Sequence, residues 1–256
     1  MKKILFKMSF FVVICLCSIL ISITHADSPS IKDPLDKKSS IQQIGPDKYE
    51  IGNVILDKNK REIFISGSIN MQNGLVEYLA CHEEVGKLHE SVLKMDAKPS
   101  DIQVALLLLG FKNDNNLKYQ GDPTIPEGDS LDIFAEWELP DKNKKRVRAE
   151  ELVFDKQNNK TMQRTHWVFT GSQIVDGQYM ADTDGSIIAT FRDPFAIINN
   201  PLPSGADDTI YFSNDKLLPP KDTQVQLIIK AAEKGASKKT LSEKTVDNYI
   251  PKDQVK

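Results

Sequence analysis

Alternation of apolar and polar residues with a period of two is the feature that most constrains the fold. Between residues 131 and 139 every second side chain is apolar: Leu131, Ile133, Ala135, Trp137 and Leu139. This period places one set of side chains on one face of a strand and the others on the opposite face. Similar stretches occur at residues 49–56, 62–69, 152–155, 166–171, 186–192 and 223–230. The sequence therefore predicts a domain built mainly of antiparallel strands.

Residues 99–110, PSDIQVALLLLG, depart from that period and predict a helix. Ser100 can cap its start, and Gly110 can adopt the left-handed conformation that ends a helix. Leu106 to Leu109 leave no polar face, so we expect burial on nearly all sides. The predicted fold class is therefore mostly β with one buried helix (α+β), an antiparallel sandwich-like or strongly curved sheet packed on the helix.

Residues 1–26 have the composition of a secretory signal peptide. Three lysines begin the segment, an uncharged and mostly apolar run extends from Met8 to Ile23, and Ala26 ends a short cleavage motif. We therefore expect a periplasmic or secreted protein, cleaved after Ala26, with no stable transmembrane domain in the mature chain. An uncleaved anchor is the alternative, because the run is only slightly shorter than the roughly 20 apolar residues that span a bilayer.

Composition also sets the expected domain boundaries. Residues 27–46 contain proline, serine and alternating charges but no aromatic residue, which is typical of a flexible linker. Residues 231–256 are rich in lysine and poor in large apolar side chains, so we expect a flexible C-terminal tail. A single β-rich domain is predicted between them, over residues 47–230.

Charge and cysteine content exclude several classes of partner and cofactor. The chain carries 33 basic and 36 acidic residues, a formal net charge of −3, and no basic stripe, so no nucleic acid is expected as a partner. Cleavage of the leader removes Cys15 and Cys17 and leaves Cys81 alone. A single cysteine forms no intrachain disulfide and holds no iron–sulfur cluster, which takes four thiolates or a mixture with histidine.

Residues 77–91 contain the densest group of candidate functional side chains. A hairpin of strands 75–82 and 87–95, with its turn at 83–86, would place His82 and His89 on one face at roughly 7–8 Å. Together with a carboxylate or His166, these histidines could bind Zn²⁺ or another divalent metal.

A hairpin register different by one residue predicts another chemistry for the same segment. It would place Cys81 beside His89, as in an activated thiolate, with Glu90 or Glu77 orienting the imidazole. A buried apolar cysteine and a structural histidine–glutamate pair are the alternatives without chemistry. The sequence leaves the register open.

Residues 166–173 form a second candidate. Trp167 and Phe169 alternate with polar residues, which predicts either a pocket wall with Thr170 and Ser172 as polar contacts or a core tryptophan. Ser172 lacks the GxSxG context of a serine nucleophile. Residues 182–185 lack the later glutamate of a calcium loop and predict a hairpin turn.

Several motifs, in order along the chain, resemble the YdjY-type family of exported bacterial proteins. They are GLVEYLAC, GKLHESVL, VALLLLG, PEGDSLDIFAEWE, RAEELV, HWVFTGS and YMADTDGSIIATFRDPFAIINNP. The resemblance covers nearly the whole predicted domain, from about residue 74 to residue 229. The resemblance implies no established activity. It does imply a set of recurrent residues, which are here Glu77, Gly86, Lys87, His89, Glu90, Ser91, Trp167, Gly171 and Ser172. His82 and His166 lie outside that pattern.

These observations predict a non-enzymatic binding domain for a small ligand, a metal ion or an envelope protein. The expected ligand-binding residues are Glu77, His89, Glu90, Ser91, Trp167, Thr170 and Ser172. A metal such as zinc would use His89, His82 and Cys81, and the identity of any cofactor is left open. The alternative function is a thiol- or metal-dependent hydrolase using Cys81 or His89.

Overall fold

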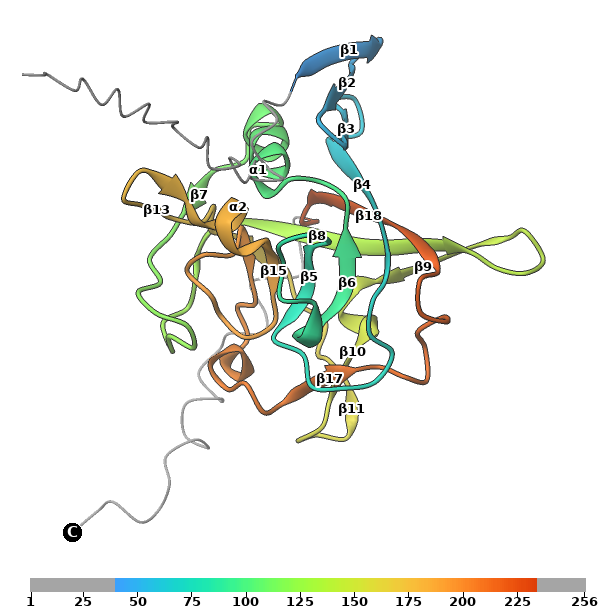
Figure 1. Cartoon of the computed structure of the whole chain (residues 1–256), viewed down its shortest axis with the longest axis vertical. Helices are drawn as coiled ribbons and strands as arrows, with labels where there is room; N and C mark the ends of the chain where they lie inside the picture. The colour runs from blue at the N-terminus through green and yellow to red at the C-terminus, as the bar shows by residue number, and fades with distance from the viewer. Residues whose placement is uncertain (1–39, 234–256) are drawn as a thin grey trace, which may run out of the picture. The chain divides into compact units, whose positions relative to one another are not determined.

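The computed structural model describes residues 40–233 of the chain. The predicted signal peptide, residues 27–39 of the predicted linker and residues 234–256 of the predicted tail lie outside this range. The described part is mostly β-structure with a few short helices (Figure 1), as the period-two pattern predicts. No helix within residues 40–233 has the length and apolar composition needed to cross a membrane.

Eight strands of the largest sheet close into a barrel. In chain order they are β4 (Glu62–Ile69), β5 (Tyr78–His82), β6 (Ser91–Met95), β8 (Glu127–Glu138), β12 (Trp167–Phe169), β15 (Ser186–Ala189), β16 (Ile198–Asn199) and β18 (Gln224–Ala231). Their order around the barrel is β4–β18–β8–β12–β16–β15–β5–β6, and β6 pairs back with β4. The predicted sandwich on a helix is therefore wrong, because a closed sheet buries its apolar face against its own opposite wall.

The barrel interior is filled by the alternate side chains that the sequence pattern identified. Leu131, Ile133 and Ala135 of β8 are fully buried, and Trp137 is 4% exposed. The register continues this layer across the neighbouring strand, where Leu227 of β18 lies opposite Ala135. The core therefore lies inside the ring of strands.

Besides the short β7 (Asn113–Asp114), which pairs with β8, four further strands extend the sheet beyond the barrel (Figure 1). They are β1 (Ile41–Gly45), β2 (Lys48–Ile51), β3 (Val54–Asp57) and β9 (Lys144–Arg148). The hairpin of β3 and β4 is as predicted, but the expected strand 49–56 is divided into β2 and β3 at Gly52, which has φ +54°. Strand β1 lies within residues 27–46, so this part of the predicted linker is paired with β2.

Helix α1 (Pro99–Leu108) is present, but its predicted burial is wrong. Ile102, Ala105 and Leu106 are buried, whereas Leu107 and Leu108 are 45% and 47% exposed. The reason is that α1 packs on the outside, against α2 (Met180–Asp184), β2 and β3, so that one side meets solvent. Helix α2 also replaces the hairpin turn predicted at residues 182–185.

The remaining elements are short and lie outside the closed ring. They are η1 (Leu88–Glu90), β7 (Asn113–Asp114), η2 (Ala149–Leu152), β10 (Val153–Asp155), β11 (Lys160–Thr161), β13 (Ile174–Val175), β14 (Gln178–Tyr179), η3 (Pro203–Ala206) and β17 (Tyr211–Ser213). Strand β10 joins β11 and β17 in a small separate sheet, and β13 and β14 form a hairpin. These elements cover parts of the barrel and carry several of the side chains described below.

Candidate functional site

Strands β5 and β6 pair in parallel, so the antiparallel hairpin predicted for residues 75–95 is wrong. Tyr78 lies opposite Ser91, and His82 lies opposite Met95. The connecting residues 83–90 therefore return along the barrel to the start of β5, where the Glu77 amide donates a hydrogen bond of 3.0 Å to the Glu90 carbonyl. Neither predicted hairpin register exists, and Glu77 and Glu90 become neighbours instead.

Two glycines allow this connection to lie flat against β5. A Cβ atom at Gly86 would come within 2.4 Å of the His82 carbonyl oxygen and 2.5 Å of the Cys81 Cβ. A Cβ atom at Gly185 would lie 2.6 Å from the Gly86 Cα. Because no side chain fits in either place, the glycines fix the path that brings Glu90 beside Glu77.

A connected set of polar side chains lies at this point. The buried Tyr78 hydroxyl donates to Asp193 Oδ2 at 2.7 Å and accepts a hydrogen bond from Lys87 Nζ at 3.2 Å. Gln120 Nε2 donates to Glu77 Oε2 at 2.8 Å and lies 3.5 Å from the same hydroxyl. We call Glu77, Tyr78, Lys87, Glu90, Gln120 and Asp193 the Glu77 cluster. It connects a buried carboxylate to groups at the surface.

Negative charge exceeds positive charge in the Glu77 cluster. Burial raises the pKa of Glu77, and the charge of Glu90 raises it further, whereas Lys87 lowers it. Burial and the charge of Asp193 also raise the pKa of nearby Asp184. Lys87 Nζ lies 3.9 Å from Glu90 Oε1 and cannot compensate all of these carboxylates at once. The arrangement favours an additional positive charge.

The residues of the predicted metal site are not brought together. His82 is buried at the end of β5, where its Nδ1 accepts a hydrogen bond from the Glu84 amide, and burial lowers its pKa. The His89 side chain is 78% exposed on η1, with Nε2 3.6 Å from Glu90 Oε2. Within residues 40–233, no group of three or more His, Cys, Asp or Glu side chains could hold a metal ion.

Cys81 does not form the activated thiol of the alternative prediction. Its side chain is fully buried, and this burial raises the pKa of the thiol to about 12. A thiol in this environment is protonated at neutral pH and out of reach of a substrate. Cys81 therefore behaves as a small core residue of β5.

The second predicted group, around Trp167, is also part of the packed interior. Trp167 is fully buried. The hydroxyl groups of Thr170 and Ser172 donate to backbone carbonyls, at 3.1 Å to Ile197 and 2.6 Å to Phe195. Ser91 is likewise buried and donates to the Leu93 carbonyl at 2.8 Å. The Thr170 and Ser172 hydroxyls therefore hold neighbouring loops against the barrel, and the Ser91 hydroxyl bonds within β6.

A second buried group of charges was missed in the sequence and lies beside β8. Arg148 lies 3.0 Å from Asp132 Oδ1 and 2.9 Å from Glu150 Oε1, and His166 Nδ1 lies 2.7 Å from Asp132 Oδ1. Although burial raises the pKa of Asp132, hydrogen bonds from Arg148 and His166 prevail and lower it. We call these four residues the Arg148 network. Its two carboxylates face a guanidinium and an imidazole.

Sequence reasoning identified Glu77, His89 and Glu90 from the dense group of polar side chains at residues 77–91, and the family resemblance added Lys87 to them. It did not single out Gln120 or Asp193, which lie 42 and 115 residues from Tyr78. Asp193 did fall within a quoted motif, RDPF, and that motif was the available signal. Gln120 lies in an exposed loop and carries no sequence signal of its own.

The fold and the site define a small closed β-barrel domain with a partly buried, predominantly acidic cluster on one of its crossovers. The model of the YdjY domain family matches residues 54–230, which is more than half of the 256-residue chain. The chain therefore belongs to the YdjY domain family, as the motifs predict. Searches of curated proteins and of solved structures each found no match. Membership of the family assigns no activity.

Proposed function

We propose that this chain is an exported binding domain whose Glu77 cluster contacts a positively charged group of a small ligand or an envelope protein. The single observation that carries the proposal is the charge imbalance at Glu77. Burial raises the pKa of Glu77 most; among the described residues, Glu90, Asp208 and Asp193 raise it further, and Lys87 lowers it. An added cation would stabilise these partly buried carboxylates, because an opposite charge nearby favours the ionised form.

The family resemblance supports the same surface. Glu77, Lys87, His89 and Glu90 are all recurrent residues in the motifs. The crossover between β5 and β6 carries the last three and brings Glu90 beside Glu77, which directly precedes β5. The His89 imidazole lies beside Glu90, with Nε2 3.6 Å from Glu90 Oε2, and most of its side chain is exposed to solvent. It is placed to meet a bound molecule at the rim of the cluster.

Binding is favoured over catalysis by the state of the candidate nucleophiles. The Cys81 thiol is buried and protonated. Burial and Asp193 raise the pKa of Tyr78, so its hydroxyl is a hydrogen-bond donor and a poor base. Both facts weigh against the thiol-dependent hydrolase, and the separation of His82 from His89 weighs against its metal-dependent form.

Export remains part of the proposal and is supported by the sequence of residues 1–26 alone. Intact mass analysis of the protein from the producing cells should give a chain that begins at Asp27. A mass that retains residues 1–26 in a membrane fraction would instead support the uncleaved anchor. Either result leaves the cation-binding surface open to separate test.

The binding proposal is tested by calorimetric titration of the purified protein with pentalysine. We expect binding that weakens with added salt, because the contact is between charges. Glu77→Gln and Glu90→Gln should each weaken it about tenfold or more, since hydrogen bonds to charged groups contribute on the order of 1.5–3 kcal/mol. Glu138→Gln, on the exposed β8–β9 hairpin, is the matched control. Equal affinity of all four proteins, or no binding by any of them, would contradict the proposal.

A further inference from the structure

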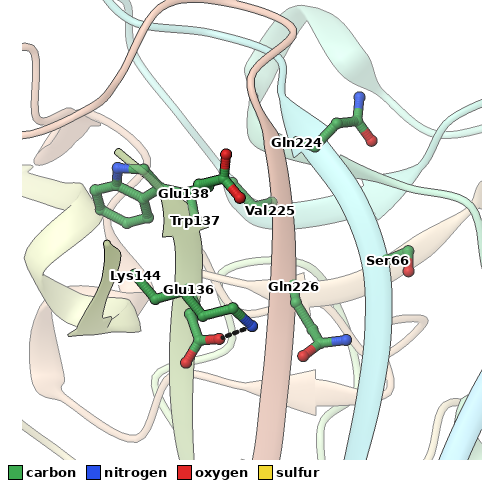
Figure 2. A pocket seen from close by; sticks show the side chains of 8 residues that line it. All are labelled: Ser66, Glu136, Trp137, Glu138, Lys144, Gln224, Val225 and Gln226. Atoms are coloured by element: carbon green, nitrogen blue, oxygen red, sulfur yellow. Dashed lines mark hydrogen bonds and ion pairs between the residues drawn. The ribbon is translucent and has the colours of Figure 1, made fainter. Parts of the chain in front are cut away.

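A hollow lies on the barrel where β8 and β18 separate. Their pairing runs from Leu131 opposite Ala231 to Glu136 opposite Gln226 and stops there. Beyond this point β18 continues to pair with β4, and β8 continues to pair with β9. The hollow has a volume of about 230 Å³, and Figure 2 shows it between the strands. Its polar lining side chains are Ser66, Glu136, Glu138, Lys144, Gln224 and Gln226.

The charges around this hollow are already paired within the protein. Glu136 lies 2.9 Å from Lys144 Nζ and 2.8 Å from Arg146 Nη2, and the contact with Lys144 is marked in Figure 2. These two cations lower the pKa of Glu136. Glu138 is paired with Lys142 at 2.7 Å. A charged ligand would therefore find no uncompensated partner here.

Neutral hydrogen-bonding groups remain available in the hollow. Among residues 40–233, the Ser66 hydroxyl and the Gln226 amide have no side-chain hydrogen bond, and Gln224 has one long contact of 3.4 Å to the Asp222 carbonyl. Gln226 lies directly opposite Ser66 across β18 and β4, so the two groups are adjacent. An amide and a hydroxyl each supply both donors and acceptors. The hollow therefore suits a ligand that is neutral and rich in both kinds of group.

Apolar surface in the hollow is small. Trp137 and Val225 also line it, but they are only 4% and 5% exposed. A predominantly apolar ligand would bury little area against these side chains. The volume is also below the roughly 300–1,000 Å³ of pockets that enclose drug-sized molecules. Only a single small unit of a ligand can enter.

We propose that this hollow binds one unit of a neutral saccharide, with its hydroxyl groups bonded to Ser66, Gln224 and Gln226. The site is distinct from the Glu77 cluster, since it is built from β4, β8, β9 and β18 rather than from the β5–β6 crossover. The two sites differ in their dependence on salt. Binding of a neutral sugar does not depend on ionic strength, whereas binding of a cation at the Glu77 cluster weakens as salt is added.

The test is a two-dimensional NMR titration of the whole protein with methyl glucoside and, separately, with N-acetylglucosamine. We expect at least one sugar to shift the side-chain amide signals of Gln224 and Gln226, with an affinity that added salt does not change. Gln226→Ala should weaken binding about 2- to 10-fold, the equivalent of one lost hydrogen bond. Gln157→Ala, at an exposed turn, is the matched control.

Three outcomes would overturn the proposal. They are the absence of shifts at Gln226 with both sugars, loss of the shifts on adding salt, and unchanged affinity in a folded Gln226→Ala variant. If that variant does not fold, Ser66→Ala takes its place, because Ser66 is exposed and makes no side-chain hydrogen bond within the described residues. Binding of pentalysine at the Glu77 cluster is measured on the same samples, so failure of one site is distinguishable from failure of the other.

Discussion

The Arg148 network and the Glu77 cluster both place carboxylates in partly or fully buried positions, but only one of them is balanced. In the Arg148 network, Asp132 and Glu150 are 1% exposed and are held by Arg148, with His166 on Asp132. In the Glu77 cluster, several carboxylates share the charge of Lys87. Burial opposes ionisation at both sites: at Asp132 the hydrogen bonds from Arg148 and His166 overcome it and lower the pKa, whereas at Glu77 burial and the charge of Glu90 together raise the pKa.

Under the proposed function, this difference separates a structural group of charges from a binding site. A buried carboxylate with matched partners stabilises its own ionised form and needs nothing from outside the protein. A carboxylate short of positive charge costs stability, and a ligand can recover that cost by bringing a cation. Perturbed pKa values mark both regions, and the proposed function assigns the region with the raised pKa to a partner.

The largest expected effect is the loss of stability when the Arg148 network is disrupted. Arg148→Met leaves Asp132 and Glu150 buried without a guanidinium and should lower the free energy of unfolding by about 3–5 kcal/mol. Arg146→Met removes an exposed partner of Glu136 and should cost less than about 1 kcal/mol. Urea unfolding of both variants measures the two losses in the free energy of unfolding, which are then compared. Similar losses would show that the Arg148 network is no more structural than a surface ion pair.

A smaller loss of stability is expected from a substitution at Gly86, where the crossover packs on β5. Gly86→Ala places a Cβ atom against the His82 carbonyl and should destabilise the fold by about 1–3 kcal/mol through overpacking. Gly45→Ala has room for its Cβ, with the nearest atom 3.9 Å away, and serves as the control. Thermal unfolding measures the difference. If both substitutions are neutral, tight packing of the glycine is not what positions Glu90.

Removing the positive charge of the cluster sharpens the contrast further. Lys87→Met should raise the pKa of Glu77 beyond its value in the native protein, because Lys87 is the charge that lowers it. The effect on the free energy of unfolding should stay within about 1 kcal/mol, since Lys87 is partly exposed. Carboxyl NMR titration measures the pKa. A fall in the pKa of Glu77 in this variant would be inconsistent with the charge imbalance.

The smallest expected effect is on the pH dependence of stability, where the two regions should differ in sign. The raised pKa of Glu77 contributes stability below its ordinary value of 4.5 that is lost as pH rises through the folded-state pKa. The lowered pKa of Asp132 contributes stability above its ordinary value of 3.8 that is lost as pH falls through the folded-state pKa.

These two contributions are measured by the midpoints of urea unfolding between about pH 3 and 7, the range in which carboxylates titrate. Glu77→Gln should flatten the decline above pH 4.5. Asp132→Asn should reduce the loss on the acidic side, apart from its own cost to stability. A Glu77→Gln profile identical to that of the native protein would mean that the carboxylate is not perturbed.

The sequence predicted those parts of the fold that depend on local patterns. The alternation at residues 131–137 identified β8 and its inward side chains, and the apolar run ending at Gly110 identified α1. The predicted cap at Ser100 was wrong, because the helix begins at Pro99 with Lys98 at its N-cap and no side chain caps it. The burial of α1 was wrong because burial depends on what the rest of the chain places around a helix. A leucine run alone does not show that Leu107 and Leu108 face solvent.

Features that join distant parts of the chain were beyond local reasoning. Closure of the barrel depends on pairing between β4 and β6, and the parallel crossover depends on contact between Gly86 and Gly185. A hairpin was the simplest pairing for two adjacent strands, but the barrel places residues 83–90 between them as a return path. Asp193 and Gln120 were missed because they lie far along the chain from the rest of the Glu77 cluster, whereas the recurrent residues of the crossover lie close together in sequence.

The most direct test of the account is a carbon-13 NMR pH titration of the Glu77 and Asp132 carboxyl groups in one sample, with and without pentalysine. The account predicts that Glu77 titrates above 4.5 and Asp132 below 3.8, and that pentalysine lowers the pKa of Glu77 without moving that of Asp132. A Glu77 carboxyl that titrates at or below its ordinary value, and that pentalysine leaves unmoved, would contradict it.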